Sequence, residues 1–183
     1  MKIIPPCQKY IPKTYFSNPR FNTDGKLVYL AGPVLGGGGW QEEAIDLLAT
    51  KVKNPLIACP MLFHFPHKYA GSQISQGEEP PYENQIEWEQ HFMYLATIEG
   101  CLLFWLPKEC EPYRTRHPYA MITRDEIGAW RTHKKYVPHM RMVVGIEDGF
   151  PGKPELVWLL QNQIGLEAHE TLEATINAAI NVL

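Results

Sequence analysis

Short apolar runs alternate with helix-like segments along most of this chain, and this alternation is the feature that most constrains its fold. The runs LVYLAGP (27–33) and CLLFWL (101–106) are almost wholly apolar, as expected of strands buried on both faces of a sheet. Residues 41–52 instead space their apolar side chains with the period of a helix. Strands and helices in such alternation predict an α/β domain with an open, mostly parallel, doubly wound sheet.

The whole predicted order contains about five strands, and its size is typical of flavodoxin-like, more broadly Rossmann-like, sheets. Thr123 is the predicted N-cap of the third helix. At 183 residues and 45% apolar, the chain suffices for a single domain with one core, which we expect over residues 26–183. The predicted elements are strand 27–33, helix 41–52, strand 56–61, helix 82–98, strand 101–106, helix 123–132, strand 142–146, helix 154–163, a short strand around Leu166 and helix 172–182.

Residues 1–25 form a proline-rich segment with scattered aromatic residues and no helix or strand period. They predict an extended arm that wraps around the domain or around a neighbouring subunit. An arm that crossed to a neighbour would bury Tyr10, Tyr15 and Phe16. We therefore expect a homo-oligomer, with an arm folded back on its own domain as the alternative.

The net charge of −3, from 17 basic and 20 acidic residues, is too close to balance for a nucleic-acid polymer to be the partner. No run approaches the roughly 20 apolar residues of a membrane span, and the N-terminus lacks a signal-like apolar stretch. Cys59 and Cys101 lie in apolar runs and predict buried thiols. We expect a cytoplasmic protein without a metal or cofactor, since His64 and His67 have no third ligand at a fixed spacing.

Ligands of doubly wound sheets bind where the loops after the strands converge, which directs attention to the segment GPVLGGGGW (32–40). Its five glycines allow a close approach of the backbone to a ligand, although a flexible turn would also explain their presence. The segment lacks the Lys-Ser/Thr pair of a triphosphate-binding loop. Trp40 suits either stacking on a base or anchoring the following helix in the core.

Two helices carry carboxylates near these loops. In YENQIEWEQ, Glu83, Glu87 and His91 share one stripe of the helix, whereas Glu89 lies on another face. In TRDEIGAW, Asp125 and Glu126 fall in the predicted first turn. Carboxylates at such positions can simply complement the helix dipole, so spacing alone leaves their role open.

The chain resembles nucleoside 2-deoxyribosyltransferases through VYLAGP, the WQ pair at 40–41, QIEWE, the FW-containing strand and DEIG, in family order over residues 27–150. The resemblance implies that Glu126 is the nucleophile, that Tyr29 hydrogen-bonds it, and that Glu89 engages the base and its proton. Glu87 is the alternative to Glu89, because the chain has Ile98, Glu99 and Gly100 where the family has Ala-Asp. The implied partners are a nucleoside or nucleotide and a free nucleobase. The candidate substrate-binding residues are Gly32, Pro33, Trp40, Gln41, Glu87, Arg124 and Asp125.

An anionic carboxylate below the sugar ring can stabilise an oxocarbenium-like state and bond to C1′, while an acid neutralises the leaving base. A second base then gives transfer, and water gives hydrolysis. The cluster Arg114, Arg116, His117 and Arg124 suits a 5′-phosphate, so a nucleoside 5′-monophosphate hydrolase is one alternative. A solvated loop in which these cations pair with Glu109 and Glu111 explains the cluster equally well. A non-catalytic nucleotide-binding module is the other alternative function.

Overall fold

The computed structural model describes residues 1–4, 26–60, 82–110 and 118–183. Its strands and helices follow the predicted alternation, with one additional strand at the N-terminus. Side chains of helix α2 are described from Gln85 onward. In chain order the elements are β1 (Lys2–Ile4), β2 (Leu27–Ala31), α1 (Trp40–Lys51), β3 (Leu56–Ala58), α2 (Tyr82–Glu99), β4 (Gly100–Leu106), α3 (Met121–Tyr136), β5 (Met142–Ile146), α4 (Lys153–Ile164), β6 (Ala168–His169) and α5 (Leu172–Asn181).

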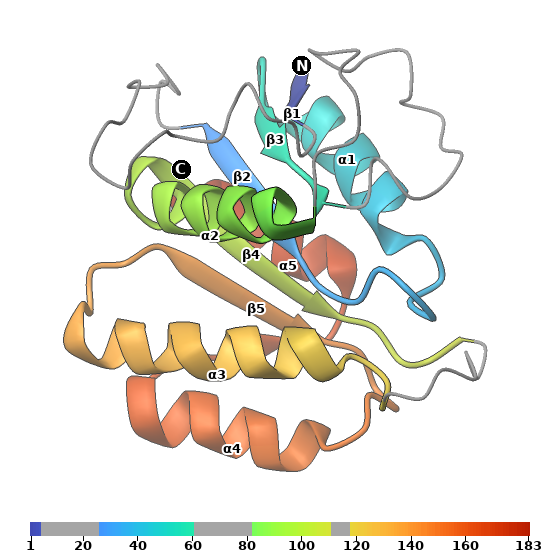
Figure 1. Ribbon diagram of the computed structural model, residues 1–183, viewed down its shortest axis with the longest axis vertical. Helices are drawn as coiled ribbons and strands as arrows, with labels where there is room; N and C mark the ends of the chain where they lie inside the picture. Colours follow the sequence, from blue (N-terminus) through green and yellow to red (C-terminus); the bar gives the residue numbers. More distant parts are fainter. Residues whose placement is uncertain (5–25, 61–81, 111–117) are drawn as a thin grey trace.

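The strands form one parallel sheet in the order β1-β3-β2-β4-β5-β6 (Figure 1). Without β1, the order in space is second, first, third, fourth and fifth strand of the chain, which is the flavodoxin-like arrangement. The predicted fold class is therefore confirmed, with six strands in place of about five. Strand β4 lies in the middle, and all seven of its residues are buried, as its apolar sequence predicts.

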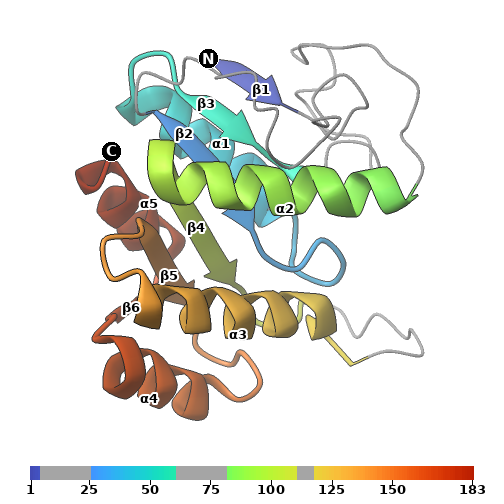
Figure 2. The same cartoon turned by 60° about the vertical axis from the view of Figure 1, so that its left-hand side comes forward.

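Helices cover both faces of the sheet (Figures 1 and 2). Helices α2 and α3 lie side by side on one face, where Trp88, Phe92, Ile127 and Trp130 pack against the strands. Helices α1 and α5 cover the opposite face around a second buried cluster. Because every crossover is parallel, the helices start at the edge where the strands end, so side chains at the beginnings of α2 and α3 meet at that edge.

Helix α3 begins at Met121, so the prediction of Thr123 as its N-cap is wrong. Ala120 is the N-cap, with a left-handed backbone (φ 55°), and Thr123 is buried. The start is fixed by tertiary contacts that local sequence does not reveal: the Tyr119 hydroxyl donates to the Pro107 carbonyl at 2.9 Å. Asp125 consequently lies beyond the first helical turn, which contains no acidic residue, and the same holds for Glu126. Complementing the helix dipole therefore does not account for either carboxylate.

The first residues of the predicted arm belong to the sheet. Strand β1 pairs with β3 in the register Ile3 to Ile57, and Ile3 and Ile4 are fully buried. The remainder of the arm, residues 5–25, lies outside the described residues. Removing the whole arm would therefore remove an edge strand and two core side chains.

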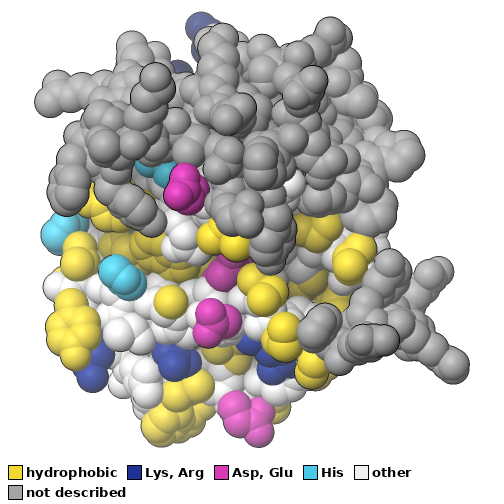
Figure 3. Space-filling view, viewed as in Figure 1, with side chains coloured by type: hydrophobic (Ala, Val, Ile, Leu, Met, Phe, Trp, Pro, Cys, Tyr) yellow, Lys and Arg dark blue, Asp and Glu magenta, His cyan; other side chains and the backbone are white. Residues whose placement is uncertain are grey.

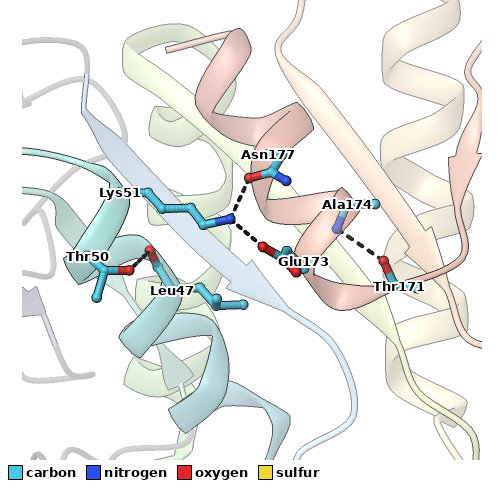
Figure 4. A network of polar contacts seen from close by, with 7 residues as sticks. All are labelled: Leu47, Thr50, Lys51, Thr171, Glu173, Ala174 and Asn177. Atoms are coloured by element: carbon cyan, nitrogen blue, oxygen red, sulfur yellow. Dashed lines mark hydrogen bonds and ion pairs between the residues drawn. The ribbon is translucent and has the colours of Figure 1, made fainter.

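A polar network ties the two helices of the back face together (Figure 4). The Lys51 ammonium of α1 contacts Glu173 at 2.7 Å and Asn177 at 2.8 Å, both on α5. The Thr171 hydroxyl caps α5 by accepting from the Ala174 N–H at 3.2 Å. The network is exposed, so its contribution to stability is small. It lies on the opposite side of the sheet from α2 and α3.

The buried thiols predicted for Cys59 and Cys101 are confirmed. Within the described ranges, no helix combines the length and the hydropathy needed to cross a bilayer.

Candidate active site

Tyr29, Glu89 and Glu126 come from three elements, β2, α2 and α3, and helices α2 and α3 cover the face of the sheet on which Tyr29 packs. Burial raises the pKa of Tyr29 well above its ordinary value, and the negative charges of Glu89 and Glu126 raise it further. Glu89 also raises the pKa of Glu126. Like charges shift each other's pKa in this way when they are near neighbours, so the three groups share one site.

The site is built on an aromatic floor. Tyr29 is 2% exposed, and its ring centroid lies 6.0 Å from that of Trp88. Trp88 in turn packs at 4.8 Å against Phe92, one helical turn along α2. These rings fix the position of α2 over β2, and Glu89 follows Trp88 directly in the chain. In the sequence Trp88 stands within the QIEWE motif, and its spacing of four residues from Phe92 is the signal of a buried helix face.

Acidic side chains, interspersed with hydrophobic ones, are visible on this face of the molecule (Figure 3). Burial raises the pKa of Glu89 to about 7. Burial, and then the negative charges of Glu89 and Asp125, raise the pKa of Glu126 to about 8. Neighbouring carboxyls release their protons in two steps that belong to the pair. Between these two values the pair holds about one proton, and because Glu126 has the higher pKa, this proton lies mainly on Glu126 when no substrate is bound.

Glu89 and Glu87 differ in exposure because they lie on different faces of α2. Glu87 is exposed, whereas Glu89 is partly buried and interacts with Tyr29 and Glu126. Glu83 of the predicted stripe has its side chain outside the described residues, and His91 packs edge-on against Phe92 at 5.2 Å. Glu89, and not Glu87, is therefore the α2 carboxyl whose charge raises the pKa of the nucleophile candidate Glu126.

The loop 32–39 after β2 is tightly anchored. The Pro33 carbonyl accepts from the Trp40 indole N–H at 3.0 Å and from the Gln41 amide at 3.1 Å. A Cβ on Gly32 would lie 2.3 Å from the Trp105 carbonyl oxygen, so only glycine fits there. The φ of 71° at Gly38 also favours glycine, and the glycine run is thus a structured turn.

Trp40 belongs to the core cluster on the α1 and α5 face and is 4% exposed. Of its two predicted roles, the structure has the core anchor, and the ring is not available to stack on a base. Gln41 is equally buried. Gly32, Pro33, Trp40 and Gln41 therefore shape the loop at the end of β2. The Trp40 side chain lies away from the carboxyl pair because it packs on the opposite face of the sheet.

Arg124 is engaged by the loop after β5. Its guanidinium donates to the Pro151 carbonyl and lies 4.9 Å from the centre of the Phe150 ring. Lys108 pairs with Glu147 at 3.3 Å, and Lys153 with Asp148 at 3.8 Å. These three cations connect loops at the carboxyl edge of the sheet. The predicted phosphate contacts Arg114, Arg116 and His117 lie outside the described residues, as do His64 and His67.

Among the described residues, no three His, Cys, Asp or Glu side chains are grouped so that they could hold a metal ion. A comparison with known protein families and with curated proteins finds no match to this chain. The candidate site therefore rests on its own geometry: two charge-coupled carboxyls over a buried tyrosine, between the N-terminal halves of two parallel-running helices.

Proposed function

We propose that the protein cleaves and re-forms the N-glycosidic bond of nucleosides, acting as a nucleoside deoxyribosyltransferase. The observation that carries this proposal is the pair Glu89 and Glu126, which are coupled to each other and to Tyr29 in a partly buried site. Retaining glycosidases need two such carboxyls, one ionised and one protonated. The family resemblance adds the substrate class, a nucleoside, and assigns Glu126 as the nucleophile.

The reactive form is the one in which the single proton of the pair has moved from Glu126 to Glu89, so that Glu126 is ionised. In the first half-reaction the Glu126 carboxylate bonds to C1′ while the bond from C1′ to the base nitrogen breaks. Glu89 gives its proton to the leaving base, which departs neutral, and Glu89 becomes an anion. In the second half-reaction an incoming base attacks C1′, loses its N–H proton to Glu89, and releases Glu126. Atoms and charges balance over the cycle, and water in place of the second base gives hydrolysis.

The buried Tyr29 hydroxyl remains protonated, because its pKa is raised by burial and by the two carboxylates. It is therefore a hydrogen-bond donor at neutral pH and suits the role of holding an oxygen of the ionised Glu126 in place. A donor that stays neutral supports a carboxylate without adding a competing charge.

The direct test is incubation of the purified full chain with deoxyinosine and free adenine. We expect deoxyadenosine and hypoxanthine to form in equal amounts. If hypoxanthine and free deoxyribose form instead, the protein is a hydrolase. The absence of any base release, with nucleoside bound, would favour the non-catalytic binding module.

The pH dependence of the reaction follows from the raised pKa values. Below about pH 7 both carboxyls are protonated and the nucleophile is lost, and above about pH 8 both are ionised and the acid is lost. We expect kcat/KM, measured from pH 5 to pH 10, to follow a bell with its maximum between these values. Two unperturbed carboxyls would place the maximum near their ordinary pKa of 4.5. A maximum below pH 6 would contradict the raised pKa values of the two carboxyls.

We propose a homo-oligomer as the working unit, with the proline-rich arm crossing between subunits. Because residues 2–4 belong to the sheet, the test uses the full chain and no truncation. Light scattering coupled to gel filtration, over a range of concentrations, is expected to give a multiple of 21.0 kDa. A mass of one chain at every concentration, with activity intact, would contradict the oligomer.

A further inference from the structure

Two isoleucines stand exposed at the beginnings of the helices that carry the carboxyl pair. Ile86 of α2 is 42% exposed and Ile122 of α3 is 59% exposed. An exposed isoleucine is common on protein surfaces and by itself indicates nothing. The position of these two relative to the acidic pair is what distinguishes them from the other exposed hydrophobic residues.

Ile86 lies three residues before Glu89, and Ile122 lies four residues before Glu126. Side chains at these spacings share one face of a helix, so each isoleucine lies one turn beyond its carboxyl. Both helices start at the edge where the strands end, so both isoleucines lie on the open side of the acids. Hydrophobic side chains are seen beside acidic ones on the face of the molecule shown in Figure 3.

The other exposed hydrophobic side chains described for these helices are Tyr94 and Ile98 of α2 and Met121 and Tyr136 of α3. Tyr94 and Met121 are each five residues from the carboxyl of their helix and therefore lie on a different helix face from it. Ile98 is at the end of α2, and Tyr136 is at the end of α3, next to the edge where the strands begin. Ile86 and Ile122 are the exposed isoleucines at the beginnings of the two helices that carry the carboxyls. β-branched side chains have restricted rotamers, and they offer a firm apolar surface to a flat ligand.

We propose that Ile86 and Ile122 form the subsite for the nucleobase, contacting the faces of the planar heteroaromatic ring. This inference rests on the proposed function, because it takes the leaving group to be a base. The faces of such a ring are apolar and its edge carries nitrogen atoms, so aliphatic walls can hold the faces while Glu89 reaches the edge. The deoxyribose, which is rich in hydroxyl groups, gains less from apolar walls.

The charged groups at the carboxyl edge of the sheet also favour an uncharged nucleobase as the ligand. Lys108, Arg124 and Lys153 are engaged by protein carboxylates, carbonyls or an aromatic ring. Among the parts of the chain that the structure describes, these cations stabilise loops, and the isoleucine pair lies beside acidic groups. A neutral base can approach that surface without repulsion, whereas an anionic ring would be repelled by it.

The experiment measures the binding of free adenine and free cytosine by calorimetry to the full chain and to Ile86→Ser, Ile122→Ser and the double variant. Ile98→Ser is the matched control, because Ile98 is an exposed isoleucine on α2 far from the site. We expect each single change near the site to weaken adenine binding about tenfold, the loss of most of one buried aliphatic side chain. The loss should be smaller for the smaller ring, cytosine, and the control should bind both bases as the unaltered chain does.

Transfer kinetics provide the second readout. The Ile122→Ser variant should raise KM for the acceptor base while kcat at saturation stays within about threefold, as expected when uniform binding is removed. Ile122→Leu should restore most of the affinity. Unaltered adenine affinity in both single variants, or no base binding by the unaltered chain, would overturn the subsite.

Light scattering on the same proteins tests whether this exposed apolar face instead contacts a second copy of the chain. A fall in oligomeric mass in Ile86→Ser or Ile122→Ser would show that this face contacts another copy, which also overturns the inference. Failure of the proposed function has a different signature: no transfer by the unaltered chain, while base binding and its dependence on the two isoleucines persist.

Discussion

Glu126→Gln is expected to reduce the transfer of deoxyribose from deoxyinosine to adenine by at least about 1,000-fold, because the amide cannot form the bond to C1′. This substitution is expected to leave the fold intact. Glutamine has the same size, and Glu126 is only partly buried at the edge of the core. Steady-state kcat/KM, measured at the pH optimum, gives the effect.

Stability distinguishes loss of chemistry from loss of fold in this variant. The folded protein raises the pKa of Glu126, so it holds a proton that the unfolded chain releases, and its stability falls as pH rises from 4.5 toward 8. Glutamine removes this penalty. We therefore expect Glu126→Gln to unfold at an equal or higher temperature than the unaltered chain at pH 8. Glu155→Gln, which alters an exposed carboxylate in the first turn of α4, is the matched control and should keep full activity. Activity of Glu126→Gln within about tenfold of the unaltered chain would refute the nucleophile assignment.

Glu89→Gln is expected to slow transfer by about 100- to 10,000-fold for ordinary bases, the usual contribution of a general acid. The loss should depend on the leaving group. An N7-methylated deoxyguanosine already carries a positive base, which leaves as a neutral molecule without a proton from the enzyme. Base release from that substrate should therefore change little in Glu89→Gln, and the alkaline limb of the pH profile should disappear.

The same experiment separates the two carboxylates of α2. Glu87→Gln alters an exposed side chain two residues away and should leave both substrates almost unaffected. Equal losses for the ordinary and the methylated substrate in Glu89→Gln would contradict a role in proton transfer. A large loss in Glu87→Gln would move the acid to Glu87.

The sequence predicts the sheet well because a short, wholly apolar run such as 101–106 is typical of a strand that is buried on both faces. It does not reveal β1, since three residues show no period and their burial depends on the neighbouring β3. The start of α3 was misplaced because the Tyr119 contact with Pro107 sets it. Both errors have one physical cause: tertiary contacts override local propensity.

The candidate site divides in the same way. Spacing on α2 shows that Glu87 and Glu89 face different directions, but only the packing of Trp88 on Tyr29 shows which direction leads to Glu126. Trp40 allowed a base-stacking role until its burial in the opposite core was known. The pKa shifts of the two carboxyls had no sequence signal, because they arise from burial and from charges far apart in the chain.

The most direct measurement of the central claim is the mass of the intact protein after brief incubation with deoxyinosine in the absence of an acceptor base, followed by acid quenching and peptide mapping. The account predicts a fraction of the protein heavier by one deoxyribosyl group, attached to the peptide that contains Glu126, absent in Glu126→Gln, and lost when adenine is added before quenching. Base release without any such adduct, or an adduct on a different residue, would contradict it.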